Sequence, residues 1–408
     1  MTTDHTSLIK LAQKLLAESA GYPIKLNNPK SLSNQHAVLR CQLDRALPDS
    51  SLSVILKQVT TTMFNNPDGP PGESHRFLNE WASLSFLGNL PGKSHYGPQL
   101  LASDREANLI ILEDFGEHQT MQDILFGTDR DSAKKGMKAI GTFLGRMQVA
   151  TYGRADEFSR EQSRLKVSSP NSDSTIDFRD QKRIAVFQSC LAVLQITPAT
   201  GFWTALENLE QSIHSPGPLH NFIHADAGPH NFLYLDDEVQ LLDYEFGAFN
   251  HGMLDVVSAR LGFPHTADVQ SVPPEEANQL ERAYQRELAQ VIPQITDNTF
   301  FEQELVKACA HWALSRWAGG WMHYFKDRFE IGDEMTSNKK MNISADEAQI
   351  MRSRAMTLYK SFIQFAQITN HQLPIAETLQ SFTRILQQEW PELEVMPIYP
   401  ALRESDPK

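Results

Sequence analysis

The sequence predicts an α+β protein with two lobes: a small β-rich N-terminal lobe over residues 1–113 and a large, mainly helical C-terminal lobe over residues 114–408. Two observations support this division. A chain of 408 residues is too long for one compact core. Strand patterns are concentrated before Glu113, whereas apolar residues at helical spacing dominate after it.

The N-terminal lobe contains three segments with strand patterns. They are HAVLRCQL (36–43), SLSVILKQV (51–59) and NLIILE (108–113). The first alternates, the second is apolar on both faces, and the third is apolar throughout. A loop rich in Pro and Gly leads into a helix predicted from Ser74 to about Leu87, with Gly88 at its end.

The C-terminal lobe is predicted to be helical around one hairpin. Helical patterns cover 120–127 and 133–151 and recur after Pro273. A polar, Ser-rich stretch over about 153–181 is predicted to be a mobile insertion or loop. The segment FLYLDDEVQLL (232–242) predicts a strand, an acidic turn at Asp236–Glu238, and a return strand.

Composition limits the class of partner. The net charge of −13 argues against non-specific binding to nucleic acid or to an anionic membrane, and it is compatible with a cationic small substrate. Cys41, Cys190 and Cys309 are too far apart for a disulfide framework or a zinc motif. No stretch approaches about 18 uninterrupted apolar residues, and the N-terminus has no signal pattern. We therefore predict a cytoplasmic protein, with no prediction of its oligomeric state.

The polar residues around the hairpin have the spacing of a metal and proton-transfer site. His224, Asp226 and Asn231 follow the order His-x-Asp-x-x-x-x-Asn, and Asp243 comes twelve residues after Asn231. A hairpin of this length brings its ends together, so Asn231 and Asp243 can face one metal. Two oxygen ligands suit Mg²⁺, and a further carboxylate can accept a hydroxyl proton. The alternative, that Asp and Asn simply favour loops, accounts for Asp236 but not for this spacing.

The stretches HADAGPHN and LLDYE resemble the catalytic and metal-binding loops of the aminoglycoside phosphotransferase and choline kinase family, which has a protein-kinase-like fold. The resemblance implies that Asp226 is the catalytic base and that Asn231 and Asp243 bind Mg²⁺. It also implies that His224 braces the loop and that Asp255 is a structural aspartate. A plain carboxylate near a helix N-terminus is the alternative for Asp255.

A protein-kinase-like lobe requires a strand lysine that holds nucleotide phosphates. Lys57 lies in an apolar strand, where a charge needs a partner. Glu80 on the predicted helix is the favoured partner, and Glu73 is the less favoured one. Backbone groups near Glu113, at the end of the third strand, are expected to bind the adenine edge.

The loop predicted to cover the nucleotide contains no glycine, unlike the Gly-rich protein-kinase form. Ser31, Ser33 and Asn34 are the candidates for phosphate contacts in this loop. Their presence as ordinary turn residues explains the sequence nearly as well.

The acceptor is predicted to be a small molecule, because Asp255 comes only twelve residues after Asp243 and this short segment leaves no room for peptide docking. Aromatic residues at helical spacing are candidates to surround an ammonium group, although core packing is an alternative. These residues are Trp317, Trp321 and Tyr324. Glu245 is predicted to lie at the mouth of the acceptor site or near the metal. The alternative is that Glu245 is a purely structural carboxylate.

Together these features predict a phosphotransferase that uses ATP and Mg²⁺ and moves the γ-phosphate to a hydroxyl of a small molecule of the aminoglycoside, amino alcohol or sugar type. The first alternative is a non-catalytic nucleotide-binding scaffold. The second is a metal-dependent hydrolase, which leaves Lys57 unexplained.

Overall fold

The computed structural model forms two units, each built from separate chain segments. The described residues are 5–32, 37–47, 52–59, 73–92, 96–167, 188–264, 270–318 and 344–404. The first unit comprises Met1–Gln119, Arg154–Ser169 and Gln240–Gly247. The second unit comprises Thr120–Gly153, Pro170–Val239 and Ala248–Lys408.

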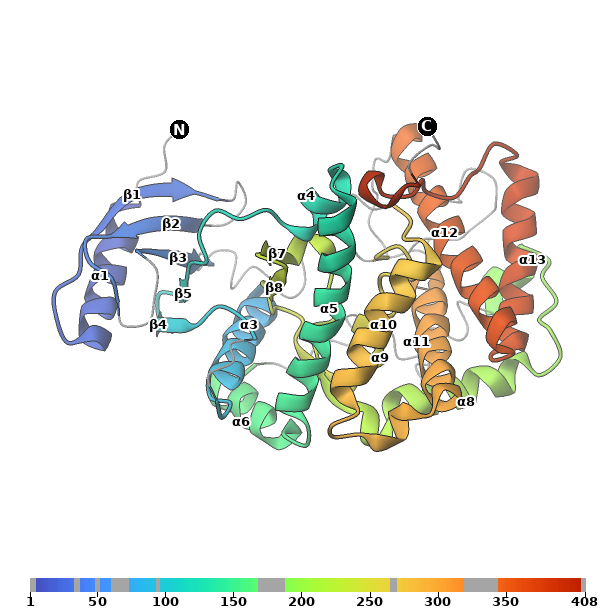
Figure 1. Ribbon diagram of the computed structural model, residues 1–408, viewed down its shortest axis with the longest axis horizontal. Coiled ribbons are helices and arrows are strands. Elements are labelled where there is room, and N and C mark those ends of the chain that lie inside the picture. Colours follow the sequence, from blue (N-terminus) through green and yellow to red (C-terminus); the bar gives the residue numbers. More distant parts are fainter. Residues whose placement is uncertain are drawn as a thin grey trace. The chain divides into compact units, whose positions relative to one another are not determined.

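The first unit contains a five-stranded antiparallel sheet in the order β1-β2-β3-β5-β4 (Figure 1). Its strands are β1 (Leu26–Ser31), β2 (Ala37–Leu43), β3 (Ser53–Gln58), β4 (Leu100–Asp104) and β5 (Leu109–Glu113). Its helices are α1 (Thr6–Ala20), α3 (Glu73–Gly88) and α6 (Ala155–Leu165).

The sheet has one apolar face and one face that carries Lys57. Leu39 and Leu56 on the apolar face are buried in a cluster that includes Leu16 of α1. Val38 and Ile110 lie directly opposite Lys57 in the neighbouring strands. Because directly paired residues share a face, these two residues and Lys57 point away from α1.

The sequence did not predict strands β1 and β4, which form the two edges of the sheet. Only Leu26 of β1 is buried, and Pro29 cannot donate to a ladder. The pairing of β1 with β2 also shifts register between Asn27 and Lys30. An edge strand needs no continuous apolar pattern, so polar edges are easily mistaken for loops.

The stretch predicted as a loop over about 153–181 begins with a helix, so that part of the prediction is wrong. Helix α6 is mostly polar, and its buried residues are Phe158 and Leu165. Asp156 and Glu157 in its first turn suit the positive end of the helix dipole. Residues 168–181 of the predicted insertion lie outside the described residues.

The second unit is mainly helical. Its α-helices are α4 (Met121–Phe126), α5 (Arg130–Thr151), α8 (Phe202–His214), α9 (Met253–Val256), α10 (Pro274–Leu288), α11 (Asn298–Ala318), α12 (Ala345–Thr369) and α13 (Leu373–Glu389). Short 3₁₀ turns are η1 (Gly217–Leu219), η2 (Pro229–Asn231), η3 (Pro293–Thr296) and η6 (Pro400–Leu402). The predicted α+β class, with a small β-rich part and a larger helical part, is confirmed.

Two small antiparallel sheets interrupt these helices. The strand β6 (His220–Ile223) pairs with β9 (Ala248–His251), and β7 (Phe232–Leu235) pairs with β8 (Glu238–Leu241). The chain passes from the second unit into the first at Gln240, within β8. The pair formed by β7 and β8 is the hairpin predicted from the sequence.

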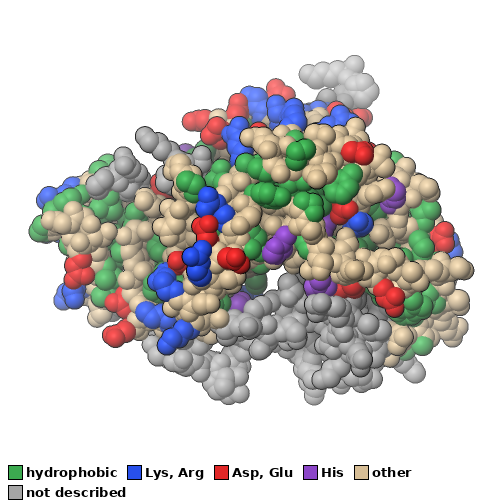
Figure 2. All heavy atoms as spheres, turned by 90° about the horizontal axis from the view of Figure 1, so that it is seen from below, with side chains coloured by type: hydrophobic (Ala, Val, Ile, Leu, Met, Phe, Trp, Pro, Cys, Tyr) green, Lys and Arg blue, Asp and Glu red, His purple; other side chains and the backbone are tan. Residues whose placement is uncertain are grey.

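Charged side chains of both signs lie next to one another on the face drawn in Figure 2. Within the described ranges, no helix combines the length and the apolar character needed to cross a membrane.

The contact of α5 with α10, which run side by side in Figure 1, depends on glycine. A methyl group at Gly141 of α5 would overlap the backbone carbonyl oxygen of Leu280 in α10. We expect Gly141→Ala to lower the free energy of unfolding by about 2 kcal/mol, because the helices must separate to admit the methyl group. Chemical denaturation measures the change. Gly88→Ala is the control, since a methyl group there meets open space, and equal stability of both variants would contradict the close packing.

Candidate active site

The central contact of the candidate site is made by Lys57 on β3. Its ammonium lies 2.5 Å from the Glu80 carboxylate of α3 and 2.6 Å from Oδ1 of Asp243. All three residues belong to the first unit. A lysine on the third strand paired with a glutamate on the following helix is the arrangement of a protein-kinase N-terminal lobe. The first unit is therefore protein-kinase-like in this ion pair.

The electrostatics of this contact favour a charged lysine. Burial by itself lowers the pKa of Lys57, but the carboxylates of Glu80 and Asp243 outweigh burial and hold the pKa above its ordinary value. Burial raises the pKa of Glu80 to about 7, against the opposing effect of the Lys57 ammonium. Glu80 is almost fully buried, so its charge depends on Lys57.

The hairpin that leads to Asp243 has a tight turn. Asp236 and Asp237 have φ angles of 48° and 70°, as a two-residue turn of the primed type requires. Lys135 and Tyr234 hold the Asp237 carboxylate at 2.8 and 2.6 Å. Glu238 was expected in the turn but lies in β8.

Asp243 itself has a left-handed backbone, with φ at 65°. This conformation is uncommon for a residue other than glycine, and surrounding contacts must hold it. Glu245, two residues further on, lies 3.9 Å from Arg76 of α3. The structure thus places Glu245 against α3, and its predicted role at the acceptor stays a prediction.

The loop that carries Asp226 belongs to the second unit and begins where β6 ends. Asn231 donates its amide hydrogens to the backbone oxygen of Asp226 at 2.9 Å and to Oδ2 of Asp226 at 3.3 Å. The amide nitrogen therefore faces Asp226. The amide oxygen of Asn231 therefore faces away from these two oxygens.

Asp255 of α9 binds the start of this loop. Its carboxylate accepts the backbone N–H groups of His224 at 2.6 Å and of Ala225 at 2.9 Å. His224 is fully buried, and its Nδ1 accepts the N–H of Asp226 at 3.2 Å. Ala225 has a left-handed φ of 63°, so the two bonds from Asp255 hold a strained turn directly before Asp226.

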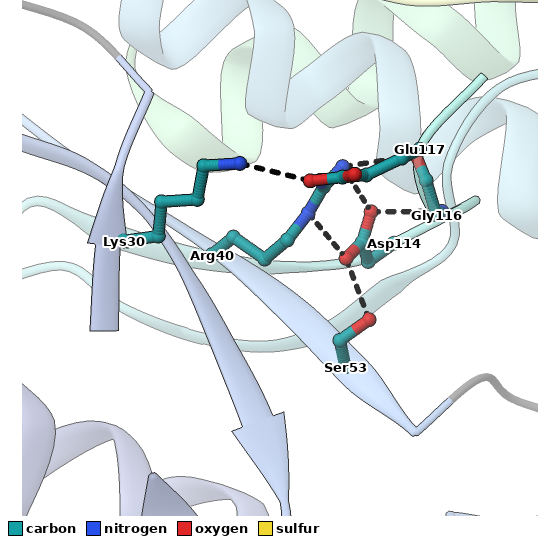
Figure 3. A network of polar contacts seen from close by, with 6 residues as sticks. All are labelled: Lys30, Arg40, Ser53, Asp114, Gly116 and Glu117. Carbon is teal, nitrogen blue, oxygen red and sulfur yellow. Dashed lines mark hydrogen bonds and ion pairs between the residues drawn. The ribbon is translucent and has the colours of Figure 1, made fainter. Parts of the chain in front are cut away.

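The chain after β5 is attached to the sheet by a network of ion pairs and hydrogen bonds (Figure 3). Asp114, which is 3% exposed, accepts from Nη2 of Arg40 at 3.0 Å and from the Ser53 hydroxyl at 2.6 Å. The Arg40 guanidinium also donates to the carbonyl oxygen of Gly116 at 2.9 Å. Glu117 completes the network with Lys30 at 2.8 Å. Three strands are thereby tied to residues 114–117.

Sequence reasoning did not assign a role to Arg40 or Asp114. The signal for Arg40 was present, because it interrupts the alternating apolar strand HAVLRCQL. Arg40 shares the Lys57 face of the sheet, since it pairs with Ile55 two residues from Lys57. Its partner was not predictable, because Asp114 follows β5 rather than lying within a strand.

The other residues predicted from the sequence are Glu113, Ser31, Trp317 and four residues that lie outside the described ranges. Glu113 ends β5, and its backbone N–H donates to the carbonyl of Gln99 at 2.9 Å. Its carboxylate accepts from the Gln99 N–H at 3.2 Å. Ser31 is the exposed last residue of β1. Trp317 lies in α11. Ser33, Asn34, Trp321 and Tyr324 lie outside the described residues.

Asn231 and Asp243 carry side-chain oxygens of the kind that Mg²⁺ prefers. Within the described part of the chain, no group of three or more His, Cys, Asp or Glu side chains is arranged to hold a metal ion. Oxygens of this kind suit an ion that also keeps water and phosphate oxygens as ligands, as Mg²⁺ does.

Comparison with known proteins gives structural likenesses only. No protein-family model matches the sequence, and no curated protein matches it. Choline kinase from Cryptosporidium parvum is 12% identical, with a TM-score of 0.45 over 95% of this chain and 97% of that one. Amicoumacin kinase in complex with AMP-PNP, Ca²⁺ and Ami is 13% identical, with a TM-score of 0.45 over 90% of this chain and 97% of that one.

A third structure, the ternary complex of APH(2″)-IIa with streptomycin and ATP, is 12% identical. Its TM-score is 0.44 over 82% of this chain and 96% of that one. The chain is thus similar to structures of the kind that its motifs resemble.

The Arg40–Asp114 pair gives a first test of the site. Asp114→Asn removes the charge that balances a largely buried guanidinium, so we expect the free energy of unfolding to fall by about 3 kcal/mol. Glu117→Gln is the matched control, because Glu117 is the other carboxylate that contacts Arg40, at 3.3 Å, but is exposed, so its pairs with Arg40 and Lys30 should contribute little. Urea denaturation of both variants measures the difference. An Asp114→Asn protein as stable as the control would show that the Arg40 charge needs no partner.

Asp255 gives a second test, through pH. Burial raises the pKa of Asp255 to about 6, although two backbone N–H groups oppose this. Between about pH 4 and pH 6 the folded protein binds this proton and the unfolded chain does not. The contribution of Asp255 to stability is therefore fully present below about pH 4 and is lost as pH rises through 6.

Asp255→Asn lacks this titration. We expect the stability of the wild type relative to the variant to be about 2 kcal/mol lower at pH 7.5 than at pH 4.5. Urea denaturation of both proteins at the two pH values measures this difference. A difference that does not change with pH would contradict a raised pKa for Asp255.

Proposed function

We propose that this protein is a phosphotransferase that moves the γ-phosphate of ATP to a hydroxyl group of a small molecule. The observation that carries the proposal is the contact of Lys57 with both Glu80 and Asp243. An ammonium has three donors, and these carboxylates account for two of them. The third donor is suited to a phosphate oxygen, as in protein-kinase-like enzymes.

Asn231 and Asp243 are the proposed ligands of Mg²⁺, which when bound would neutralise charge on the phosphates. Asp226 is the proposed base, which orients the acceptor hydroxyl and takes its proton as the oxygen attacks the γ-phosphorus. The bond from this phosphorus to the β,γ-bridging oxygen breaks, and ADP leaves. The contacts of Asp226 with Asn231 and of Asp255 with the preceding residues support this role, because they hold the carboxylate in one place.

The acceptor class is proposed from two features. The segment between Asp243 and Asp255 contains the short strand β9 and leaves no room for a peptide-docking segment. The net charge of −13 suits a cationic acceptor. Trp312, which precedes in the sequence the aromatic residues predicted to surround an ammonium group, donates its indole N–H to the Leu254 carbonyl at 2.9 Å. We therefore assign Trp312 to packing. From the short segment and the net negative charge, we propose amino alcohols and aminoglycosides as the first acceptors to test.

Purified protein with ATP, MgCl₂ and a panel of amino alcohols, sugars and aminoglycosides tests the proposal. Formation of ADP that depends on one acceptor, with a phosphorylated product seen by mass spectrometry, is the expected result. ATP binding without transfer to any acceptor would favour the scaffold. ADP and phosphate release without an acceptor would favour the hydrolase.

Asp226→Asn tests the assignment of the base. We expect the variant to bind ATP as the wild type does and to transfer phosphate at least about 100-fold more slowly, because Asn cannot take the hydroxyl proton. Equilibrium binding of ATP and the rate of ADP formation measure the two effects. Asp237→Asn is the control, since it makes the same change in the hairpin turn, where Asn tolerates a left-handed backbone. Transfer at the wild-type rate in Asp226→Asn would exclude Asp226 as the base.

A further inference from the structure

The buried side chain of Asn79 joins α3 to the segment that follows Asp243. Asn79 is 3% exposed and lies next to Glu80 in the sequence. Its Nδ2 group donates to the backbone carbonyl of Glu245 at 3.1 Å and to that of Gly247 at 2.9 Å. One amide therefore holds two backbone positions within four residues of Asp243.

These two bonds determine which way the Asn79 amide points. Backbone carbonyl oxygens only accept hydrogen bonds, so the Asn79 NH₂ group must face them and its oxygen must face the other way. In that direction lies Gln162 of α6, which donates from Nε2 to Oδ1 of Asn79 at 2.9 Å. Both donors and the acceptor of the Asn79 amide are thus used, as a buried amide requires.

The same helix also holds the side chains of this segment. Arg76, one turn before Asn79 on α3, lies 3.9 Å from the Glu245 carboxylate. Its guanidinium also stands over the ring of Phe246, 5.0 Å from the ring centre. Residues 245–247 are thus held by α3 through backbone and side chains.

Helix α6 packs beside α3 in the first unit (Figure 1). The rings of Phe86 on α3 and Phe158 on α6 lie 5.5 Å apart. Gln162 stands one turn after Phe158 and thus on the same side of α6. The polar insertion therefore supplies a donor to the buried amide that holds the segment after Asp243.

We propose that Asn79 and Gln162 are positioning residues that hold the loop 243–247 in the geometry needed for the divalent cation. The hydrogen bond from Gln162 fixes the Asn79 amide, and the amide fixes the two carbonyl groups of the loop. Asp243 then keeps its left-handed backbone. The inference rests on the proposed function, because it takes Asp243 as a ligand of Mg²⁺.

Substitution of Gln162 tests the inference while the buried Asn79 side chain itself is kept. Gln162→Leu removes the donor. Gln162→Glu keeps the size but, when ionised, presents only acceptors to the oxygen of Asn79. Arg164→Leu is the control, because Arg164 pairs with Glu161 on α6 and is exposed. If Gln162 acts by its shape alone, Gln162→Glu should behave as the wild type. If Gln162 acts as a hydrogen-bond donor, Gln162→Glu should loosen the loop at least as much as Gln162→Leu does.

The first readout is hydrogen–deuterium exchange of the peptide that covers residues 242–248, in the absence of nucleotide. We expect exchange to be about fivefold faster in both Gln162 variants and unchanged in Arg164→Leu, as the loss of one hydrogen bond implies. The second readout is the MgCl₂ concentration that gives half-maximal ADP formation. We expect it to rise about three- to tenfold in both variants, with the rate at saturating MgCl₂ nearly unchanged.

Unchanged exchange in both Gln162 variants would overturn the inference. Faster exchange with an unchanged MgCl₂ requirement would overturn its link to the cation. A wild-type protein that transfers phosphate to no acceptor would overturn the proposed function and, with it, the assignment of this loop to Mg²⁺. Exchange would then still decide whether Gln162 holds the loop, so the two failures are distinguishable.

Discussion

The ammonium of Lys57 is the charge around which the first unit is organised. An isolated charge in a largely buried position costs several kcal/mol, and that cost falls only when partners of opposite charge are placed beside it. The two partners come from α3 and from a segment 186 residues further along the chain. Residues 240–247 therefore belong to the first unit, although the residues on both sides of them belong to the second. The need to neutralise Lys57 explains why a compact unit contains so short and so distant a segment.

The two motif loops are held in different ways, and both depend on backbone groups. The loop before Asp226 offers N–H groups, and the Asp255 carboxylate accepts them. The loop after Asp243 offers carbonyl oxygens, and the Asn79 amide donates to them. Each loop also contains a residue in the left-handed region, Ala225 or Asp243, where side-chain strain opposes the conformation. Side chains outside the motifs thus hold the backbone conformations that the motifs require.

Much of the fold was predictable because its central elements repeat a simple pattern. The strands β2, β3 and β5, the helix α3 and the hairpin each combine an apolar period with turn residues at their ends. The edge strands β1 and β4 and the helix α6 were missed because little of their surface is buried. In the site, the contact of Lys57 with Glu80 followed from a charge in an apolar strand, whereas their functional roles stay predictions. The Arg40–Asp114 pair and the Asn79 bonds were not predictable, because one partner in each lies in a loop or is a backbone group.

The helix α6 adds a constraint of its own. A helix that buries only two apolar side chains gains little from packing, so it opens more readily than the core strands of the sheet. When α6 opens, the oxygen of Asn79 loses the donor that fixes the direction of its amide. A turned amide would place this oxygen against the carbonyl groups that the NH₂ group now holds, and those two bonds would be lost. The order of loop 243–247 is therefore linked to the stability of a polar insertion that lies far from it in the sequence.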